Sequence, residues 1–172
     1  MQKVFESENI AFVRVSERLV PDYLNMVNDV ERVARWIGTR TEPIPEEKEI
    51  GWVRKKLANG DLIWSMIEKR TGAFIGNIEL MGVQDSVGEL GIAITAAQQE
   101  KGFGKEAIAA TIRYGLESVG LNRIFLKVFP DNARAIHVYR ACGFKEYDRT
   151  DTDVFMEIVR DDVRPFRTEK PE

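Results

Sequence analysis

The sequence predicts an α/β fold with a mixed, mostly antiparallel sheet of about seven strands and about four flanking helices. Three strand-like segments separated by short turns lie between residues 62 and 94, and such hairpin order gives an antiparallel meander. A helical segment then separates two further strand-like segments, which adds a strand–helix–strand step. We expect residues 1–160 to form one domain, because a chain of 172 residues suits a single hydrophobic core.

The N-terminal third is predicted to contain one strand and two helices. Residues 10–15 are mostly apolar and predict the first strand. Apolar residues then recur at helical spacing through residues 21–37, where Pro21 suits a first helical turn. The segment 42–46 holds two prolines, which interrupt helical structure. The second helix follows this segment and is predicted to end at Asn59-Gly60.

The rest of the chain is predicted to contain two helices and six strands. One helix covers residues 102–118 and ends at Gly120, and Asn132 begins a short helix that reaches about residue 141. The last stretch, residues 161–172, is polar with two prolines and is interpreted as a loose C-terminal tail. The strands are expected at residues 62–67, 73–83, 89–94, 121–129, 143–147 and 154–159.

Composition and charge argue against several classes of function. The net charge of −3 is unlike that of a protein that binds nucleic acid through general phosphate attraction. One cysteine, Cys142, and one histidine, His137, cannot form a zinc site of the usual ligands, so we expect no metal. A single cysteine also allows no intrachain disulfide, which fits the reducing cytoplasm. We expect no membrane helix, because no apolar run approaches the roughly 20 residues needed, and no signal peptide, because the N-terminus is acidic.

A glycine-containing loop lies between the strand that ends near residue 94 and the helix that begins near residue 102. It holds Gln99, Gly102 and Gly104 in the pattern Gln-x-x-Gly-x-Gly. Glycine lets the backbone approach a ligand closely. The unpaired N–H groups of a first helical turn, with the helix dipole behind them, bind a pyrophosphate. Lys101 and Lys105 could add positive charge. On this loop alone, an ordinary helix start with glycines remains an alternative.

A second motif follows about thirty residues later and reads Asn132-Ala-Arg-Ala-Ile-His-Val-Tyr139-Arg-Ala-Cys-Gly-Phe144. Together the two motifs resemble those of the GNAT superfamily of N-acetyltransferases. In that family the first motif is the acetyl-CoA pyrophosphate loop, and the second follows the pattern Asn-x-x-Ala-x-x-x-Tyr-x-x-x-Gly-Phe. The resemblance covers about residues 72–160, the implied acetyl-CoA-binding core, and leaves residues 1–60 as acceptor-side elements. Within the superfamily, the chain resembles the branch of spermidine/diamine and ribosomal-protein N-terminal acetyltransferases.

The resemblance implies where acetyl-CoA binds. The family's sheet splays at the strand before the loop, and the pantetheine arm of the cofactor pairs with that strand as an added strand would. Gln99 stands where the family more often has arginine. Asn132 matches a residue that contacts the cofactor, and a plain helix N-cap is its alternative role. The implied acetyl-CoA-binding residues are Ile92, Ala93, Ile94, Gln99, Glu100, Lys101, Gly102, Phe103, Gly104, Lys105, Asn132, Ala135 and Tyr139.

The resemblance also implies two catalytic side chains. Tyr139 would protonate the thiolate of coenzyme A as it leaves, which suits a phenol of pKa about 10, although it could merely pack its helix. Glu79 would act through a water as the base for the attacking amine, and a solvent-facing strand residue is the alternative. Glu89 is the second choice for the base. We interpret His137 as a solvated helix residue and Cys142 as a small buried residue.

The acceptor is the least specified part of the prediction. Residues 41–49 hold four acids against one lysine, and this surplus would steer a polyamine or a basic peptide toward the site. A solvated helix start stabilised by acids is an equal alternative. We expect a small polyamine-like amine in preference to a protein N-terminus, with other small amines behind both. A non-catalytic acyl-CoA-binding module is the alternative from another class, and a homodimer is a family property that no feature of the sequence shows.

Overall fold

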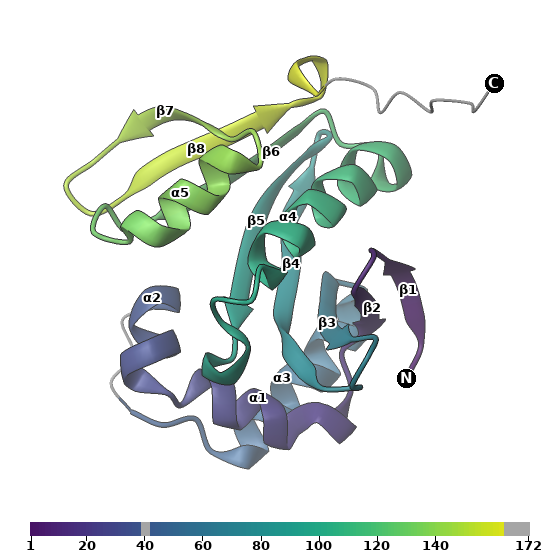
Figure 1. The fold of residues 1–172 in the computed structure, drawn as a ribbon. Coiled ribbons are helices and arrows are strands. Elements are labelled where there is room, and N and C mark those ends of the chain that lie inside the picture. Colours follow the sequence, from purple (N-terminus) through teal and green to yellow (C-terminus); the bar gives the residue numbers. More distant parts are fainter. Residues whose placement is uncertain (39–41, 164–172) are drawn as a thin grey trace.

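Eight strands and five α-helices make up the computed structural model, which describes residues 1–38 and 42–163 (Figure 1). Within these ranges, none of the helices combines the length and the apolar character that crossing a membrane requires. The strands are β1 (Lys3–Glu6), β2 (Ile10–Arg14), β3 (Leu62–Glu68), β4 (Phe74–Gln84), β5 (Val87–Ile94), β6 (Arg123–Val128), β7 (Lys145–Arg149) and β8 (Val154–Val159). The helices are α1 (Val20–Val27), α2 (Arg35–Ile37), α3 (Glu46–Asn59), α4 (Phe103–Tyr114) and α5 (Ala133–Ala141).

All eight strands form one mixed sheet in the order β1-β2-β3-β4-β5-β6-β8-β7. Every neighbouring pair is antiparallel except β5 and β6, which are parallel and are joined through α4. In the meander β3–β4–β5, Ser65 lies opposite Asn77, and Asn77 lies opposite Ala93. The sheet confirms the predicted fold class, with one strand more than the expected seven.

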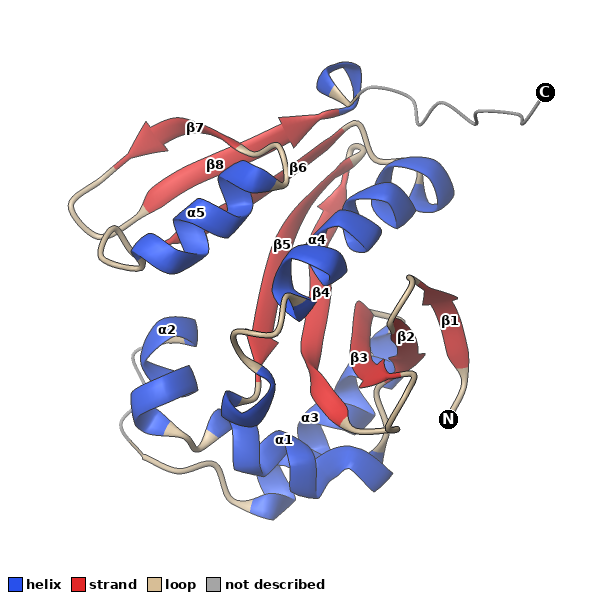
Figure 2. Cartoon of the chain, viewed as in Figure 1, coloured by secondary structure: helices blue, strands red, loops and turns tan. Residues whose placement is uncertain are grey.

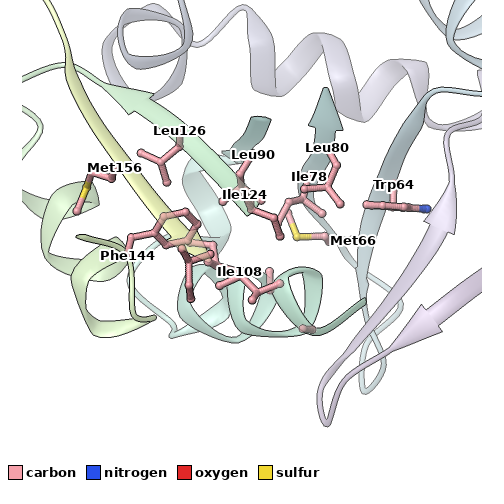
Figure 3. Close-up of a cluster of buried hydrophobic side chains, with 14 of the residues drawn as sticks. Trp64, Met66, Ile78, Leu80, Leu90, Ile108, Ile124, Leu126, Phe144 and Met156 are labelled. Carbon is pink, nitrogen blue, oxygen red and sulfur yellow. The ribbon is translucent and has the colours of Figure 1, made fainter. Parts of the chain in front are cut away.

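Helices cover both faces of the sheet (Figure 2). Alternate strand residues point to opposite faces, so Ile78 and Leu80 of β4 join a cluster with Ile108 of α4, as Figure 3 shows. Ile63 and Ile67 of β3 point the other way. There they pack in a second cluster with residues of α1 and α3, among them Val20, Tyr23, Met26 and Val53. The two clusters therefore hold α4 and α5 on one face and α1 and α3 on the other.

The prediction of one continuous helix over residues 21–37 is wrong, because the segment is interrupted after Val27. Helix α1 ends at Val27, and a π-helical turn (Val30–Ala34) leads into the single turn of α2. The Asn28 side chain accepts a hydrogen bond from Ile44 N–H (2.8 Å) and donates one to Ile44 C=O (3.0 Å). Asp29 is extended, and its carboxylate caps the new turn by accepting from Arg32 N–H (3.1 Å). These polar side chains compete with the helical ladder and interrupt it.

Strand β1 is the strand that the sequence pattern missed. Its residues are charged or exposed apart from Phe5, as suits the edge of a sheet. Phe5 lies between Phe12 and Tyr114, with ring centroids 4.2 Å from each and near-parallel planes. Aromatic stacking with partners far along the chain therefore anchors a segment without any strand-like alternation of its own.

Several helix ends follow the sequence prediction. Helix α3 ends at Gly60, which has φ +67, and the segment 102–118 is α4 extended by a π-helical turn that ends at Gly120, with φ +83. Asn132 caps α5 by accepting from Ala135 N–H (3.2 Å). Of the expected C-terminal tail, the structure describes only residues 161–163, and Thr41 of the acidic segment also lies outside the described residues.

Candidate active site

The sheet splays at β5, where the two parallel strands separate. Strand β6 pairs with only the first three residues of β5, Val87 to Glu89. Beyond them, Ile92, Ala93 and Ile94 pair with β4 on one side. No strand of the described chain pairs with their other edge, as the diverging ribbons in Figure 1 illustrate. This edge offers main-chain N–H and C=O groups to an extended ligand.

The loop that follows β5 delivers the chain to an uncapped helix N-terminus. Glu100 and Gly102 both have positive φ, +62 and +84, and Gly102 is the N-cap residue of α4. No side chain caps this helix, and the first helical hydrogen bond runs from Glu106 N–H to Gly102 C=O. The helix ladder therefore does not use the N–H groups of residues 103–105. With the positive end of the helix dipole, they form an arrangement that suits a pyrophosphate.

Gln99 shapes the loop with its side chain. Its Nε2 donates to Ile94 C=O (3.0 Å) and to Arg32 C=O (3.2 Å), so it joins the end of β5 to the turn before α2. Gly104 supports the same corner, because a Cβ there would lie 3.3 Å from Ile94 Cδ1. The Gln99 side chain thus fixes the start of the loop, and the absence of a side chain at Gly104 lets α4 approach β5 closely.

The other predicted cofactor residues divide between the loop and the core. Lys101 donates to Gln98 (3.1 Å), and Glu100 pairs with Arg134 of α5 at 3.4 Å, with both residues exposed. The Phe103 side chain is buried in the cluster between α4 and the sheet, so it can contribute to the loop mainly through its main chain. Lys105 lies in the first turn of α4, Asn132 is the N-cap residue of α5, and Ala135 lies in the first turn of α5. Their contacts with acetyl-CoA stay predictions.

Tyr139 of α5 lies partly buried, with its ring edge toward Phe144 and a centroid separation of 5.9 Å. Its hydroxyl makes no hydrogen bond to any residue within the described ranges. Burial, with a smaller contribution from Cys142, raises the pKa of Tyr139 to about 12. The phenol is therefore protonated at neutral pH and has a proton to give. Its catalytic role remains a prediction.

Cys142 follows Tyr139 by one helical turn and is a poor nucleophile. Burial raises the pKa of its thiol, against a smaller lowering by Lys105. Its Sγ donates to Lys105 C=O at 3.6 Å, which ties the end of α5 to the first turn of α4. We infer a packing role for it.

Glu79 of β4 lies over β5, the strand predicted to hold the cofactor, and its side chain is only 23% exposed. It pairs across the sheet with Gly91, and a Cβ on Gly91 would lie 3.4 Å from Glu79 Cγ and 3.6 Å from Oε1. Gly91 lies beyond Glu89, the last residue of β5 that pairs with β6, and directly precedes Ile92. Its missing side chain makes room for a carboxylate there. Glu89 is three residues from Ile92, or about 10 Å along a strand, and lines a separate open hollow of about 520 Å³.

Lys56 is a partner of Glu79 that sequence reasoning did not find. Its Nζ lies 2.9 Å from Glu79 Oε2 and 3.4 Å from Asp61 Oδ2. Burial lowers the pKa of Lys56, but its hydrogen bonds and charge pairing with Glu79 and Asp61 outweigh this and leave the pKa raised. The carboxylate of Glu79, the predicted base, is therefore already paired with a primary ammonium group, that of Lys56. No local pattern would have shown it, because the two residues are 23 positions apart.

A buried chain of hydrogen bonds was also missed. Ser16 N–H donates to Tyr23 Oη (3.2 Å), Tyr23 Oη lies 2.6 Å from Ser65 Oγ, and Ser65 donates to Asn77 Oδ1 (2.9 Å). Because Ser65 gives its proton to Asn77, Tyr23 must donate to Ser65. The chain holds Asn77 opposite Ala93, beside the open edge. A lone serine within the apolar run 62–67 was the signal that could have found it.

A splayed sheet with an open strand edge that runs into an uncapped helix N-terminus is the arrangement that the resemblance implies for an acyl-CoA-dependent transferase. The chain matches the family model of the acetyltransferase (GNAT) domain over residues 7–145, and it belongs to that family. This confirms the resemblance drawn from the two motifs, and the protein is an N-acetyltransferase. The described residues contain no group of three or more histidine, cysteine, aspartate or glutamate side chains that could hold a metal ion.

Several known proteins are similar to this chain. Spermidine N(1)-acetyltransferase of Vibrio cholerae is 25% identical over 142 residues, which are 81% of each protein. Two solved structures share the fold. They are the spermidine N-acetyltransferase of Vibrio cholerae in complex with CoA and spermine (TM-score 0.73, 20% identity, 91% of this chain and 98% of that one) and the ribosomal-protein-S5-alanine acetyltransferase of Vibrio fischeri (TM-score 0.73, 19% identity, 94% and 98%).

Proposed function

We propose that this protein transfers the acetyl group of acetyl-CoA to a primary amine, with a small polyamine or diamine as the favoured acceptor. The observation that carries the proposal is the continuous path from the open edge of β5, residues 92–94, to the uncapped N-terminus of α4. The free N–H groups of residues 103–105 and the positive φ of Gly102 fit a diphosphate. The open edge of β5 fits the extended arm attached to that diphosphate.

Each group of the site has a chemical task in this proposal. Acetyl-CoA supplies an activated acetyl thioester when bound. A primary amine of pKa about 10.4 is less than about 0.1% neutral at pH 7, so the enzyme must remove its proton. Glu79, over Gly91, would accept that proton, directly or through a water. Tyr139, protonated and without a hydrogen bond to the described residues, would donate a proton to the departing sulfur.

The preference for a small cationic amine rests on two observations. The spermidine acetyltransferase of Vibrio cholerae is similar over most of both chains. Acidic side chains also gather at the start of α3, where Glu46 and Glu47 are exposed in the first turn, within the elements that we propose to be on the acceptor side. Exposed acids raise the local concentration of a polycation through long-range attraction.

A thiol-release assay tests the proposal. Acetyl-CoA would be offered with spermidine, spermine, diamines, amino acids, aminoglycosides and short peptides. We expect release with di- and polyamines above the rate without an amine. Thiol release with peptides but with no small amine would overturn the proposed preference for a small amine, while the proposed acetyl transfer itself would stand. A thermal shift with acetyl-CoA but no release with any amine would overturn the transfer and leave an acyl-CoA-binding module.

A further inference from the structure

The ammonium group of Lys56 lies in a ready-made site for a primary amine. We call the three groups around it the Lys56 cage: Glu79 (Oε2 at 2.9 Å), Asp61 (Oδ2 at 3.4 Å) and Trp52 (ring centroid at 5.9 Å). Two carboxylates and an aromatic face are the groups that recognise an alkylammonium ion in proteins. A free amine with the same head group would find the same contacts there.

The Lys56 cage lies beside the open strand edge. Its Glu79 covers Gly91, the residue that directly precedes Ile92. Lys56 and Trp52 are one turn apart on α3, and the Trp52 ring also packs edge-on against Tyr23 at 5.9 Å. Tyr23 is part of the hydrogen-bond chain that ends at Asn77. The cage therefore lies on the sheet face that carries α1 and α3.

The contacts of Lys56 are of a kind that a ligand can exchange. The side chains of Lys56, Glu79 and Asp61 are 20%, 23% and 38% exposed, so water reaches all three. A partly hydrated ion pair contributes little net stability. The cage also holds two negative charges against one positive charge, and it therefore keeps an attraction for a second cation.

We propose that Lys56 is a specificity-determining residue that occupies the place of the acceptor's reacting ammonium and must leave Glu79 before an amine can bind. The proposal rests on the acetyl transfer proposed above. It implies that Lys56 acts as an internal competitor. Only an acceptor with a true ammonium head, which regains the contacts to Glu79, Asp61 and Trp52, displaces it efficiently. Removing the charge at position 56 should then strengthen acceptor binding.

The test compares Lys56→Met with Lys55→Met in steady-state kinetics. Methionine keeps an unbranched side chain and removes the ammonium. Lys55 is the exposed neighbour on the same helix and serves as the matched control. We expect K56M to lower KM for 1,4-diaminobutane and spermidine by about fivefold to tenfold. A tenfold change corresponds to about 1.4 kcal/mol of binding free energy. The change should appear in KM more than in kcat, and K55M should behave as the wild type.

A second pair of measurements keeps the proposal testable if turnover is slow or K56M folds poorly. Lys56→Gln also removes the charge, whereas Lys56→Arg retains it and should keep the higher KM. Calorimetric titration of 1,4-diaminobutane in the presence of CoA reports binding without chemistry and should show tighter binding to K56Q. An unchanged or raised KM in folded K56M, or equal diamine affinity in wild type and K56Q, would overturn the proposal. Absence of thiol release by the wild type would instead refute the proposed acetyl transfer.

Discussion

Replacing Tyr139 with phenylalanine removes one oxygen atom and leaves the aromatic ring in place. The ring keeps its edge-on contact with Phe144, and the hydroxyl that is lost bonds none of the described residues. We therefore expect the free energy of unfolding to change by less than about 0.5 kcal/mol. For a chain of this size, that change moves the melting temperature by about 2 °C at most. The substitution thus separates chemistry from stability.

The expected loss of rate is far larger than this effect on stability. A positioned general acid contributes about 10²–10⁴-fold, which corresponds to roughly 3–5 kcal/mol of activation free energy. Because the pKa of Tyr139 is raised to about 12, the phenol keeps its proton up to about pH 10. Ionisation of Tyr139 should therefore cause no loss of wild-type activity up to that pH, and kcat should fall only as the pH approaches 12.

The assay is thiol release at saturating acetyl-CoA, with acetyl-CoA affinity measured separately by titration. Tyr114→Phe is the matched control, because it also removes one phenol oxygen, at the far end of α4, where the Tyr114 ring stacks on Phe5. We expect kcat to fall at least a hundredfold for Y139F and to stay within twofold for Y114F, with unchanged acetyl-CoA affinity in both. A loss below threefold in Y139F would remove Tyr139 from the mechanism.

Three further outcomes test the loop, the meander and the N-terminal hairpin. Gly102→Val should weaken acetyl-CoA binding by about tenfold or more in a calorimetric titration, because φ +84 strains a β-branched residue; equal affinity would contradict the loop prediction. Gly76→Ala should destabilise the fold by roughly 1–3 kcal/mol in urea unfolding, since its Cβ would lie 2.0 Å from the main-chain oxygen of Ala93. Its control Gly51→Ala, in open space on α3, should stabilise by about 0.5–1 kcal/mol, and equal stabilities would refute the clash. Burial raises the pKa of Glu106, but hydrogen bonds from the β1–β2 turn outweigh this effect and leave the pKa below its ordinary value of 4.5. The ionised carboxylate therefore stabilises the fold above pH 4.5, and this stabilisation is lost as the pH falls below that value. Glu106→Gln should be less stable than wild type at pH 7, and the difference measured by thermal unfolding should narrow below pH 4.5; a constant gap would refute the linkage.

Sequence prediction succeeded where a signal lies within a few neighbouring residues. Gly60 and Gly120 end their helices in the left-handed conformation that favours glycine. Asn132 caps its helix through a bond to a residue three positions on. The meander of three strands is likewise readable, because its turns and apolar runs follow one another directly.

Prediction failed where a distant partner decides the local conformation. Asn28 interrupts a regular helical pattern because Ile44, sixteen positions away, takes both ends of its amide. Strand β1 forms because Phe5 stacks on Tyr114 of α4. Neither contact can be predicted from the periodicity of the segment itself, because the periodicity shows only which residues are apolar.

The sequence by itself determined the class of this protein and predicted the place of its diphosphate loop. A loop with glycines at a helix start and the motif around Tyr139 are local, and local backbone chemistry is enough to define them. Only the tertiary structure decided that Glu79 lies over Gly91 with Lys56 already bound to it. That arrangement depends on strand register and on how α3 packs against the sheet. Both arise from the burial of apolar residues along the whole chain, so no short segment contains them.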